Sequence, residues 1–121
     1  MVLIGAVFLV ACSSAADTPA SAVETYIRTR ITGDAPKLVT LACKARESDA
    51  RQEADSFAAQ KATIESVSCQ TSGAEAEFTV VACIGKMVTT YAGETRDFDL
   101  SARKFKTIQE DGRWKVCGYT R

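Results

Sequence analysis

Histidine is absent from the 121-residue chain, which removes the most common catalytic base and the most common metal ligand. A serine or cysteine nucleophile would therefore have no histidine to activate it, and this kind of catalysis is not expected. Metal binding would depend on scattered thiolates, because no Cys-x-x-Cys spacing links Cys43, Cys69, Cys83 and Cys117. Disulfides are the simpler interpretation of these cysteines, and we expect no metal or cofactor.

An excess of charge of either sign is also lacking. The chain has 15 Lys and Arg residues against 15 Asp and Glu residues, for a formal net charge of zero. No basic cluster stands out, so the electrostatic footprint of a nucleic-acid-binding protein is missing and nucleic acid is not an expected partner. The length is typical of a single domain.

No apolar run is long enough to cross a bilayer, because a spanning helix needs about 20 apolar residues. The apolar run over residues 2–10 is instead typical of a secretory signal peptide, since small residues follow it. The motif Leu-Val-Ala-Cys that ends at Cys12 resembles the lipobox of bacterial lipoproteins. That resemblance implies cleavage before Cys12 and a diacylglycerol on its thiol, with two or more acyl chains holding the protein at a membrane.

We therefore expect a lipoprotein signal peptide over residues 1–11, a flexible tether over 12–18 and a folded domain over 19–121. No Lys or Arg occurs before Cys12, which departs from the usual signal peptide. An apolar strand or helix of a cytosolic domain is the alternative for residues 1–16. Export is the favoured interpretation, and in an exported chain the four other cysteines predict up to two disulfides.

Helical spacing of apolar residues predicts three helices in the first half of the domain. The first runs over residues 19–32, with Ser21 and Glu24 as its capping box and Gly33 ending it. Asp34 is expected to cap a short second helix. A third helix over residues 49–61 has a narrow apolar stripe, and its charged residues are expected to face solvent.

Alternating apolar and polar residues predict strands from residue 64 onward. Expected strands cover residues 64–69, 74–90, 95–109 and 114–119, with turns at Thr71-Ser72-Gly73, Ala92-Gly93-Glu94 and Asp111-Gly112. The strand over 74–90 is expected to present Ala76, Phe78, Val80, Ala82 and Ile84 on one face. Within the strand over 95–109 the apolar residues change from one face to the other, and a bulge near Arg103 or Lys104 would account for this change. Together these elements predict an α+β domain with helices packed on a four-stranded antiparallel sheet.

Two stretches resemble nuclear transport factor 2-like domains, which are cone-shaped α+β folds. The opening Val23-Glu24-Thr25-Tyr26-Ile27 leads into Thr32-Gly33-Asp34, and the ending runs from Ile108 to the Trp114-Lys115-Val116-Cys117 segment. The ending is similar to the final hairpin of small lipoproteins in that superfamily. The resemblance implies a curved sheet around helices that enclose a pocket, and it implies no activity, because fold does not determine function.

The disulfide pairing stays open at this stage, because four cysteines allow three connectivities. A regular hairpin closed at residues 71–73 would leave Cys83 about 23 Å from Cys69 along the strands, too far for a disulfide, which needs Cα atoms within about 7 Å. The resemblance to the lipoproteins implies a bond between Cys43 and Cys117. That choice leaves Cys69 with Cys83, so either the hairpin is irregular, those two remain thiols, or the pairing differs.

Five aromatic residues are candidates for lining a pocket between helices and sheet: Tyr26, Phe57, Phe78, Tyr91 and Trp114. The alternative is that they fill the core, which is the more common role of aromatics on apolar faces. Asp97 and Asp99 lie two apart on a strand, and a pair of carboxylates can perform acid–base catalysis. Alternation directs them toward solvent, however, so we expect no catalytic residue.

Three functions remain, in order of preference. The first is a non-catalytic envelope lipoprotein that binds a small apolar ligand or a peptide outside the cytoplasm. The second is an assembly protein or homodimer that associates through its sheet face, where Glu75, Glu77, Asp97, Asp99 and Arg103 are expected. The third is an isomerase- or cyclase-like enzyme, which would need an acid or base buried in a pocket.

Overall fold

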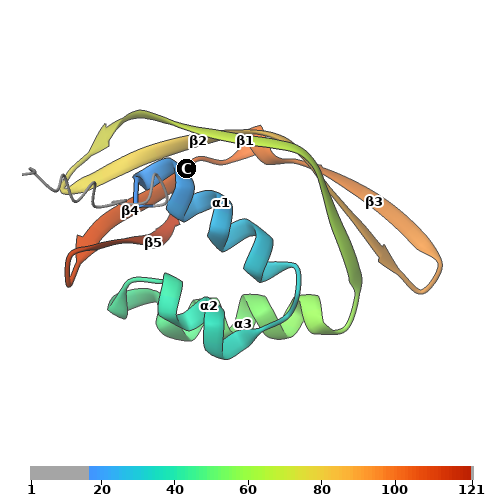
Figure 1. The fold of residues 1–121 in the computed structure, drawn as a ribbon. Helices are drawn as coiled ribbons and strands as arrows, with labels where there is room; N and C mark the ends of the chain where they lie inside the picture. Colours follow the sequence, from blue (N-terminus) through green and yellow to red (C-terminus); the bar gives the residue numbers. More distant parts are fainter. Residues whose placement is uncertain (1–16, 121) are drawn as a thin grey trace, which may run out of the picture.

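The computed structural model describes residues 17–120, in which three helices precede five antiparallel strands (Figure 1). The expected signal peptide, Cys12 and residues 13–16 lie outside the described residues. The helices are α1 (Pro19–Arg30), α2 (Ala35–Leu41) and α3 (Glu47–Ala58), with a short 3-10 helix, η1 (Lys44–Arg46), before α3. The strands are β1 (Lys61–Glu75), β2 (Phe78–Tyr91), β3 (Glu94–Asp99), β4 (Phe105–Glu110) and β5 (Arg113–Tyr119).

The α+β class is confirmed, but the expectation of four strands is wrong. A short 3-10 helix, η2 (Leu100–Ala102), divides the predicted strand over residues 95–109 into β3 and β4. The two pieces pair with β2 one after the other: β3 with residues 86–91 and β4 with residues 79–81. The slip in alternation thus marks a break between strands rather than a bulge within one.

Local chemistry explains where the helices begin, although one predicted cap is wrong. Thr18 caps α1, since its hydroxyl accepts from the Ser21 amide at 3.1 Å while the Ser21 hydroxyl accepts from the Thr18 amide at 3.1 Å. Glu24 is not part of this cap, because its carboxylate accepts from the Cys69 amide on β1 at 2.9 Å. Asp34 caps α2 as predicted, accepting from the Lys37 amide at 3.2 Å.

Gly33 joins α1 to α2 at a point where the chain passes close to α3. Its φ of 74° is in the left-handed region that glycine adopts without strain. A Cβ at this position would lie 2.8 Å from the Ala58 Cα. The α1–α2 connection therefore packs directly on the backbone at the end of α3.

The hairpin between β1 and β2 closes at Ala76 and Glu77, so the predicted turn at residues 71–73 is wrong. Glu75 pairs with Phe78 across the turn, and Ala76 has a φ of 53°. Gly73 is extended instead, with a φ of 159°, and pairs with Val80 inside the ladder. Two register shifts, at residues 65–68 and 71–73, make the hairpin irregular.

The residues of β2 that pack on the helices are not those of the predicted apolar face. Val81, Cys83 and Met87 are buried, whereas Ile84 is 63% exposed. Apolar residues occur on both faces of this strand, so alternation alone could not decide which face the helices cover. The same inward face carries Thr89, which is buried as well.

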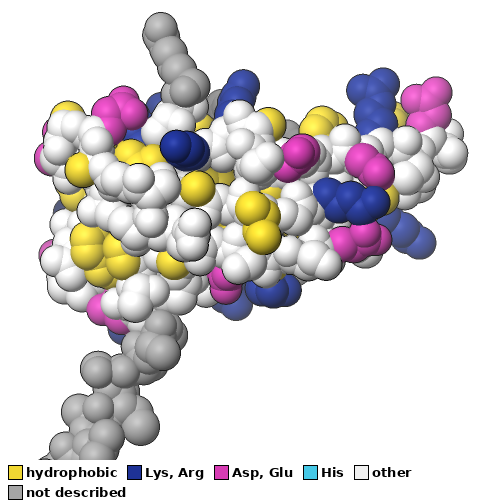
Figure 2. Space-filling model, turned by 90° about the horizontal axis from the view of Figure 1, so that it is seen from above, with side chains coloured by type: hydrophobic (Ala, Val, Ile, Leu, Met, Phe, Trp, Pro, Cys, Tyr) yellow, Lys and Arg dark blue, Asp and Glu magenta, His cyan; other side chains and the backbone are white. Residues whose placement is uncertain are grey.

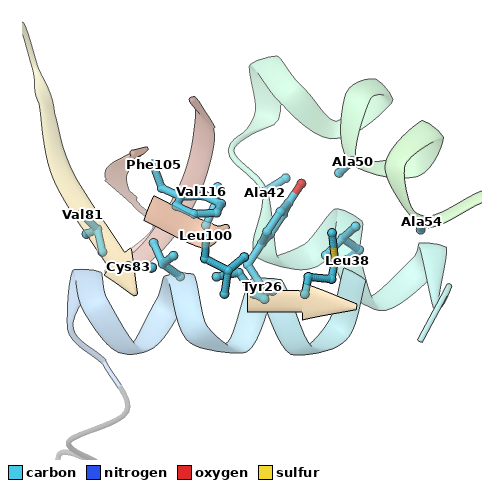
Figure 3. Packing of buried hydrophobic residues seen from close by; sticks show 13 residues of the cluster. Tyr26, Leu38, Ala42, Ala50, Ala54, Val81, Cys83, Leu100, Phe105 and Val116 are labelled. Atoms are coloured by element: carbon cyan, nitrogen blue, oxygen red, sulfur yellow. The ribbon is translucent and has the colours of Figure 1, made fainter. Parts of the chain in front are cut away.

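The core lies between the helices and the inner face of the sheet (Figure 3). Val23, Ile27 and Leu38 are fully buried, and each buried side chain of this kind stabilises the fold by about 1.5–3 kcal/mol. Helix α3 contributes small side chains, Ala50 and Ala54, which let it pack closely. The sheet side of the core is formed by a larger set: Val81, Cys83, Met87, Leu100, Phe105 and Val116.

The second half of β2 and all of β3 extend beyond the helices as a hairpin, which we call the arm (residues 86–99; Figure 1). Every residue of β3 is exposed. Figure 2 shows the outer face of the sheet, where charged side chains gather toward the arm and hydrophobic ones lie in small separate groups. At the base of the arm, Met87 and Thr89 on the inner face are buried, whereas β3 and the tip of the hairpin have little cover.

Candidate functional site

Two disulfides connect the four cysteines of the described domain, so the predicted disulfides are confirmed. Cys43 is bonded to Cys117 with Cα atoms 5.1 Å apart, and Cys69 to Cys83 with Cα atoms 4.1 Å apart. The irregular hairpin places Cys69 directly opposite Cys83, which a hairpin closed at residues 71–73 could not do. Cys43 reaches Cys117 from the side, because the Cys43 amide donates to the Val116 carbonyl at 2.9 Å along the edge of β5.

The five predicted pocket residues do not come together in the structure. Tyr26 is buried in the core, and the half-buried Phe57 lies beneath the Arg30 guanidinium at 5.4 Å. Phe78, at the start of β2, has the Lys106 ammonium 4.8 Å from its ring. Tyr91 is 65% exposed on the arm, and Trp114 is half-buried at the start of β5.

A cluster of polar side chains, Tyr26, Arg30, Glu53 and Tyr119, lies between α1, α3 and β5; we call it the polar cluster. One carboxylate oxygen of Glu53 accepts from the Tyr119 hydroxyl at 2.8 Å and from the Tyr26 hydroxyl at 3.2 Å. The Arg30 guanidinium lies 3.5 Å from the same oxygen and donates to the Tyr119 hydroxyl at 2.6 Å. These contacts join two helices and the last strand.

Burial dominates the electrostatics of the polar cluster. Burial, followed by the nearby Glu53 carboxylate, raises the pKa of the Tyr26 hydroxyl far above its ordinary value. Burial likewise raises the pKa of Tyr119, with the Arg30 guanidinium acting in the opposite direction. Both phenols therefore stay protonated and serve as hydrogen-bond donors across the whole neutral range.

This arrangement is suited to holding elements together rather than to transferring protons. Two protonated phenols and a guanidinium already surround the Glu53 oxygen that would act as a base. The Arg30 Nε is buried without a hydrogen-bond partner among the described residues, and the guanidinium stacks on Phe57. None of the four hollows that we describe below is lined by a residue of the polar cluster.

Sequence reasoning missed the polar cluster, although part of its signal was visible. Tyr26 and Arg30 lie four residues apart on the apolar face of α1, a spacing that brings side chains together. Glu53 was expected to face solvent, yet it lies on the same side of α3 as Ala50, Ala54 and Phe57. Tyr119 is distant in sequence from both helices, and no local pattern connects it with them.

Asp97 and Asp99 are on the surface, as alternation predicts, and each has a partner. Asp97 lies 3.4 Å from the Lys86 ammonium, which also contacts Glu65 at 3.4 Å. Asp99 accepts from the amide and the hydroxyl of Ser101, and these hydrogen bonds lower the pKa of its carboxyl group. With Ser66 and Gly85, these side chains line an open hollow of about 540 Å³ on the outer face.

A second hollow, which we call the arm groove, lies between the arm and the end of α3. It has a volume of about 360 Å³. Its walls come from the inner face of the arm, where Tyr91 and Phe98 are 65% and 47% exposed, and from the end of α3. The remaining lining residues are polar or small: Ser56, Ala59, Gln60, Thr89, Glu94 and Arg96.

A third hollow, of about 560 Å³, lies where the described chain begins, and we call it the N-terminal hollow. It is bounded by Asp17 and the start of α1, by the end of α2, and by the β4–β5 turn with Trp114. The turn residues Asp111 and Gly112 both have positive φ, 54° and 76°, as the predicted two-residue hairpin requires. A fourth hollow, of about 410 Å³, lies between the β1–β2 hairpin and residues 101–104.

Comparison of the chain with models of known families, with curated proteins and with solved structures finds no match. Over residues 17–120, no helix has the length and apolar character needed to span a membrane. The same part of the chain holds no group of three or more potential ligands that could bind a metal ion. The two disulfides are compatible with a location outside the cytoplasm.

Proposed function

We propose that this chain is a lipid-anchored domain of a bacterial envelope that binds an extended peptide segment of a partner protein. The lipid anchor rests on the lipobox-like motif ending at Cys12 and on the apolar run before it. Two disulfides support this location, because such bonds persist in oxidising compartments. In an unlipidated cytosolic domain, neither the lipobox-like motif nor the two disulfides would have a role.

A nuclear transport factor 2-like fold is part of the same proposal. In its favour, the Val23–Ile27 segment supplies the buried face of α1, and a short helix capped by Asp34 follows. The sheet curves over α1, and its last two strands form the hairpin that the resemblance implies (Figure 1). These are the same features that carried the resemblance in the sequence.

The arm groove is the observation that carries the binding function. Tyr91 and Phe98 are large, exposed and on the side of the sheet that is elsewhere buried by helices. Aromatic side chains at such positions supply much of the binding energy of protein interfaces. The groove is open and half polar, so it fits a polypeptide better than a small apolar ligand.

The outer edge of β3 indicates how a peptide would bind. Among the described residues β3 pairs only with β2, so its other edge has free amide and carbonyl groups. A partner strand added there would direct alternate side chains into the arm groove, toward Tyr91 and Phe98. The opposite side chains would meet Asp97 and Asp99, which favours basic residues at those positions.

A photo-crosslinking amino acid placed at Tyr91, in cells that make the native protein, tests this function. We expect covalent capture of a specific envelope protein, whose crosslinked segment is then synthesised as a peptide. Binding of that peptide should weaken at least about tenfold in Tyr91→Ala, since an interface aromatic contributes about 2 kcal/mol or more. The same crosslinker at Ile84, equally exposed on the outer face, is the matched control.

Capture at Ile84 but not at Tyr91 would contradict the arm groove as the binding site. The lipid anchor has its own test, which is mass spectrometry of the intact protein purified from membranes. We expect acyl mass on Cys12 as the first residue and no free thiols. An unacylated chain that retains residues 1–11 would contradict the anchor.

A second candidate is assembly of two copies through the outer face of the sheet. Ile84 favours it, because this large hydrophobic side chain is 63% exposed on that face. The hydrophobic groups on the face are small and separate, however, which makes a stable interface harder to build (Figure 2). Sedimentation of the protein and of Ile84→Lys distinguishes the candidates, since only a dimer through this face would dissociate in the variant.

A further inference from the structure

The N-terminal hollow and the arm are at opposite ends of the molecule (Figure 1). At the first end, the Asp17 carboxylate accepts from the Trp114 amide at 3.4 Å, so the start of the described chain touches the β4–β5 hairpin. The exposed Arg113 and the half-buried Trp114 lie beside each other there. This end therefore combines the point where the chain enters the domain with an aromatic residue and cations.

The length of chain before Asp17 limits how far this end can be from the proposed lipid. Four residues, 13–16, separate Cys12 from Asp17. Even when fully extended, the five steps from the Cys12 Cα to the Asp17 Cα span only about 18 Å. Strand β1, with 15 residues, would cover about 50 Å if it were straight, so the tether is short compared with the domain.

We propose that Trp114 and the β4–β5 turn contact the headgroup region of the bilayer that holds the lipid anchor, and that the arm points away from the membrane. This inference rests on the lipid anchor of the proposed function. An indole has an apolar ring and a polar N–H, which suits the boundary between water and acyl chains. Trp114 is only partly buried in the domain, so part of this residue is accessible for that contact.

Electrostatic attraction is not the main cause of this contact. The charged residues that line the N-terminal hollow balance, with Asp17 and Asp111 against Arg113 and Lys115. Lys115 is also engaged, since its ammonium donates to the Thr40 carbonyl. The short tether keeps this end at a high effective concentration near the lipid, and the indole supplies the preference for the interface. The contact should therefore form on uncharged lipid and persist in salt.

The chain contains a single tryptophan, so intrinsic fluorescence reports on Trp114 alone. The native acylated protein is reconstituted into vesicles of phosphatidylcholine with brominated acyl chains, which quench tryptophan at short range. We expect the emission in brominated vesicles to be several-fold weaker than in unbrominated vesicles. In both kinds of vesicle we expect the emission maximum to lie to the blue of that of the protein without lipid, and added salt should change neither result. The control combines Trp114→Phe with Tyr91→Trp, which moves the only indole to the arm, where Tyr91 is 65% exposed.

In the control we expect emission almost unaffected by bromine, with circular dichroism showing that the variant is folded. Equal quenching of the two reporters, or stronger quenching on the arm, would overturn the proposed orientation. Unquenched Trp114 in a chain that carries acyl mass would overturn this inference and leave the anchor intact. Absence of acyl mass would remove the anchor and this inference together, so the two failures are distinguishable.

Discussion

The body of the domain and the arm share one strand, yet different interactions hold them. In the first half of β2, Val81 and Cys83 are fully buried, and Cys83 is also crosslinked to β1. In the second half Met87 and Thr89 are still buried, and the strand then continues past the helices to Tyr91, which is 65% exposed. One continuous strand thus supplies both core and binding surface, because the helices cover only part of its length.

The body and the arm of this small domain differ in how strongly their interactions stabilise the fold. The body has a buried core, the Cys43–Cys117 disulfide and the polar cluster, which connect segments that are distant in sequence, and the Cys69–Cys83 disulfide, which crosslinks the β1–β2 hairpin. The arm has hairpin hydrogen bonds and a few surface ion pairs, such as Lys86 with Asp97, which contribute little to stability. Exposed side chains of the arm, such as Tyr91, can therefore change with little effect on folding, unlike Met87, which belongs to the core.

The largest expected effect comes from removing the disulfide that closes the body. In the chain-entropy model, the Cys43–Cys117 bond closes a loop of 74 residues and stabilises the fold by about 4 kcal/mol. The Cys69–Cys83 bond closes a loop of 14 residues, for about 3 kcal/mol. Urea unfolding of Cys43→Ser with Cys117→Ser, against Cys69→Ser with Cys83→Ser, should show the greater loss in the first pair. The reverse order would mean that the β1–β2 hairpin depends more on its crosslink than the packing of the helices on β5 does on the Cys43–Cys117 bond.

Alkaline pH should weaken the body with an intermediate effect. The raised pKa values of Tyr26 and Tyr119 mean that the folded state keeps protons which the unfolded state loses above pH 10. Stability from these groups is therefore complete below pH 10 and falls as the pH rises further, by up to about 1.4 kcal/mol per pH unit for each phenol. The unfolding free energy of Tyr119→Phe, measured against pH, should fall less steeply than that of the wild type. A Tyr91→Phe control, which removes an exposed phenol, should keep the wild-type slope.

The smallest effect on stability is expected on the arm itself. Tyr91→Ala should change the free energy of unfolding by less than about 0.5 kcal/mol, because the side chain is exposed and lies outside the core. Leu38→Ala, in the fully buried centre of the body, should cost about 2–5 kcal/mol. Thermal unfolding of both variants makes the comparison. A large loss of unfolding free energy in Tyr91→Ala would show that the arm contributes to the stability of the body.

Features set by local chemistry could be predicted from the sequence. The Asp34 cap and the Asp111–Gly112 turn depend on residues within a few positions of each other, and both are present. The turn between β1 and β2 could not be predicted, because it is closed by Ala76 and Glu77, which are not typical turn residues, while the glycine nearby is extended. Its displacement is what brings Cys69 and Cys83 together.

Features that depend on distant segments could not be predicted in the same way. Both faces of β2 have apolar residues, so only the position of the helices decides that Val81 is buried and Ile84 exposed. The polar cluster requires Glu53 and Tyr119 to meet across 66 positions of sequence. The cysteines were an exception, because the resemblance to lipoproteins implied the Cys43–Cys117 pairing that the structure contains.

Gly33 governs the shape of the arm groove without lining it. A Cβ there would lie 2.8 Å from the Ala58 Cα, so the end of α3, which carries the groove residues Ser56, Ala59 and Gln60, would have to shift away from the α1–α2 connection. The width of the arm groove thus depends on the absence of a Cβ at Gly33, in the connection between α1 and α2. A substitution at Gly33 is therefore expected to change the width of the arm groove while every lining residue stays the same.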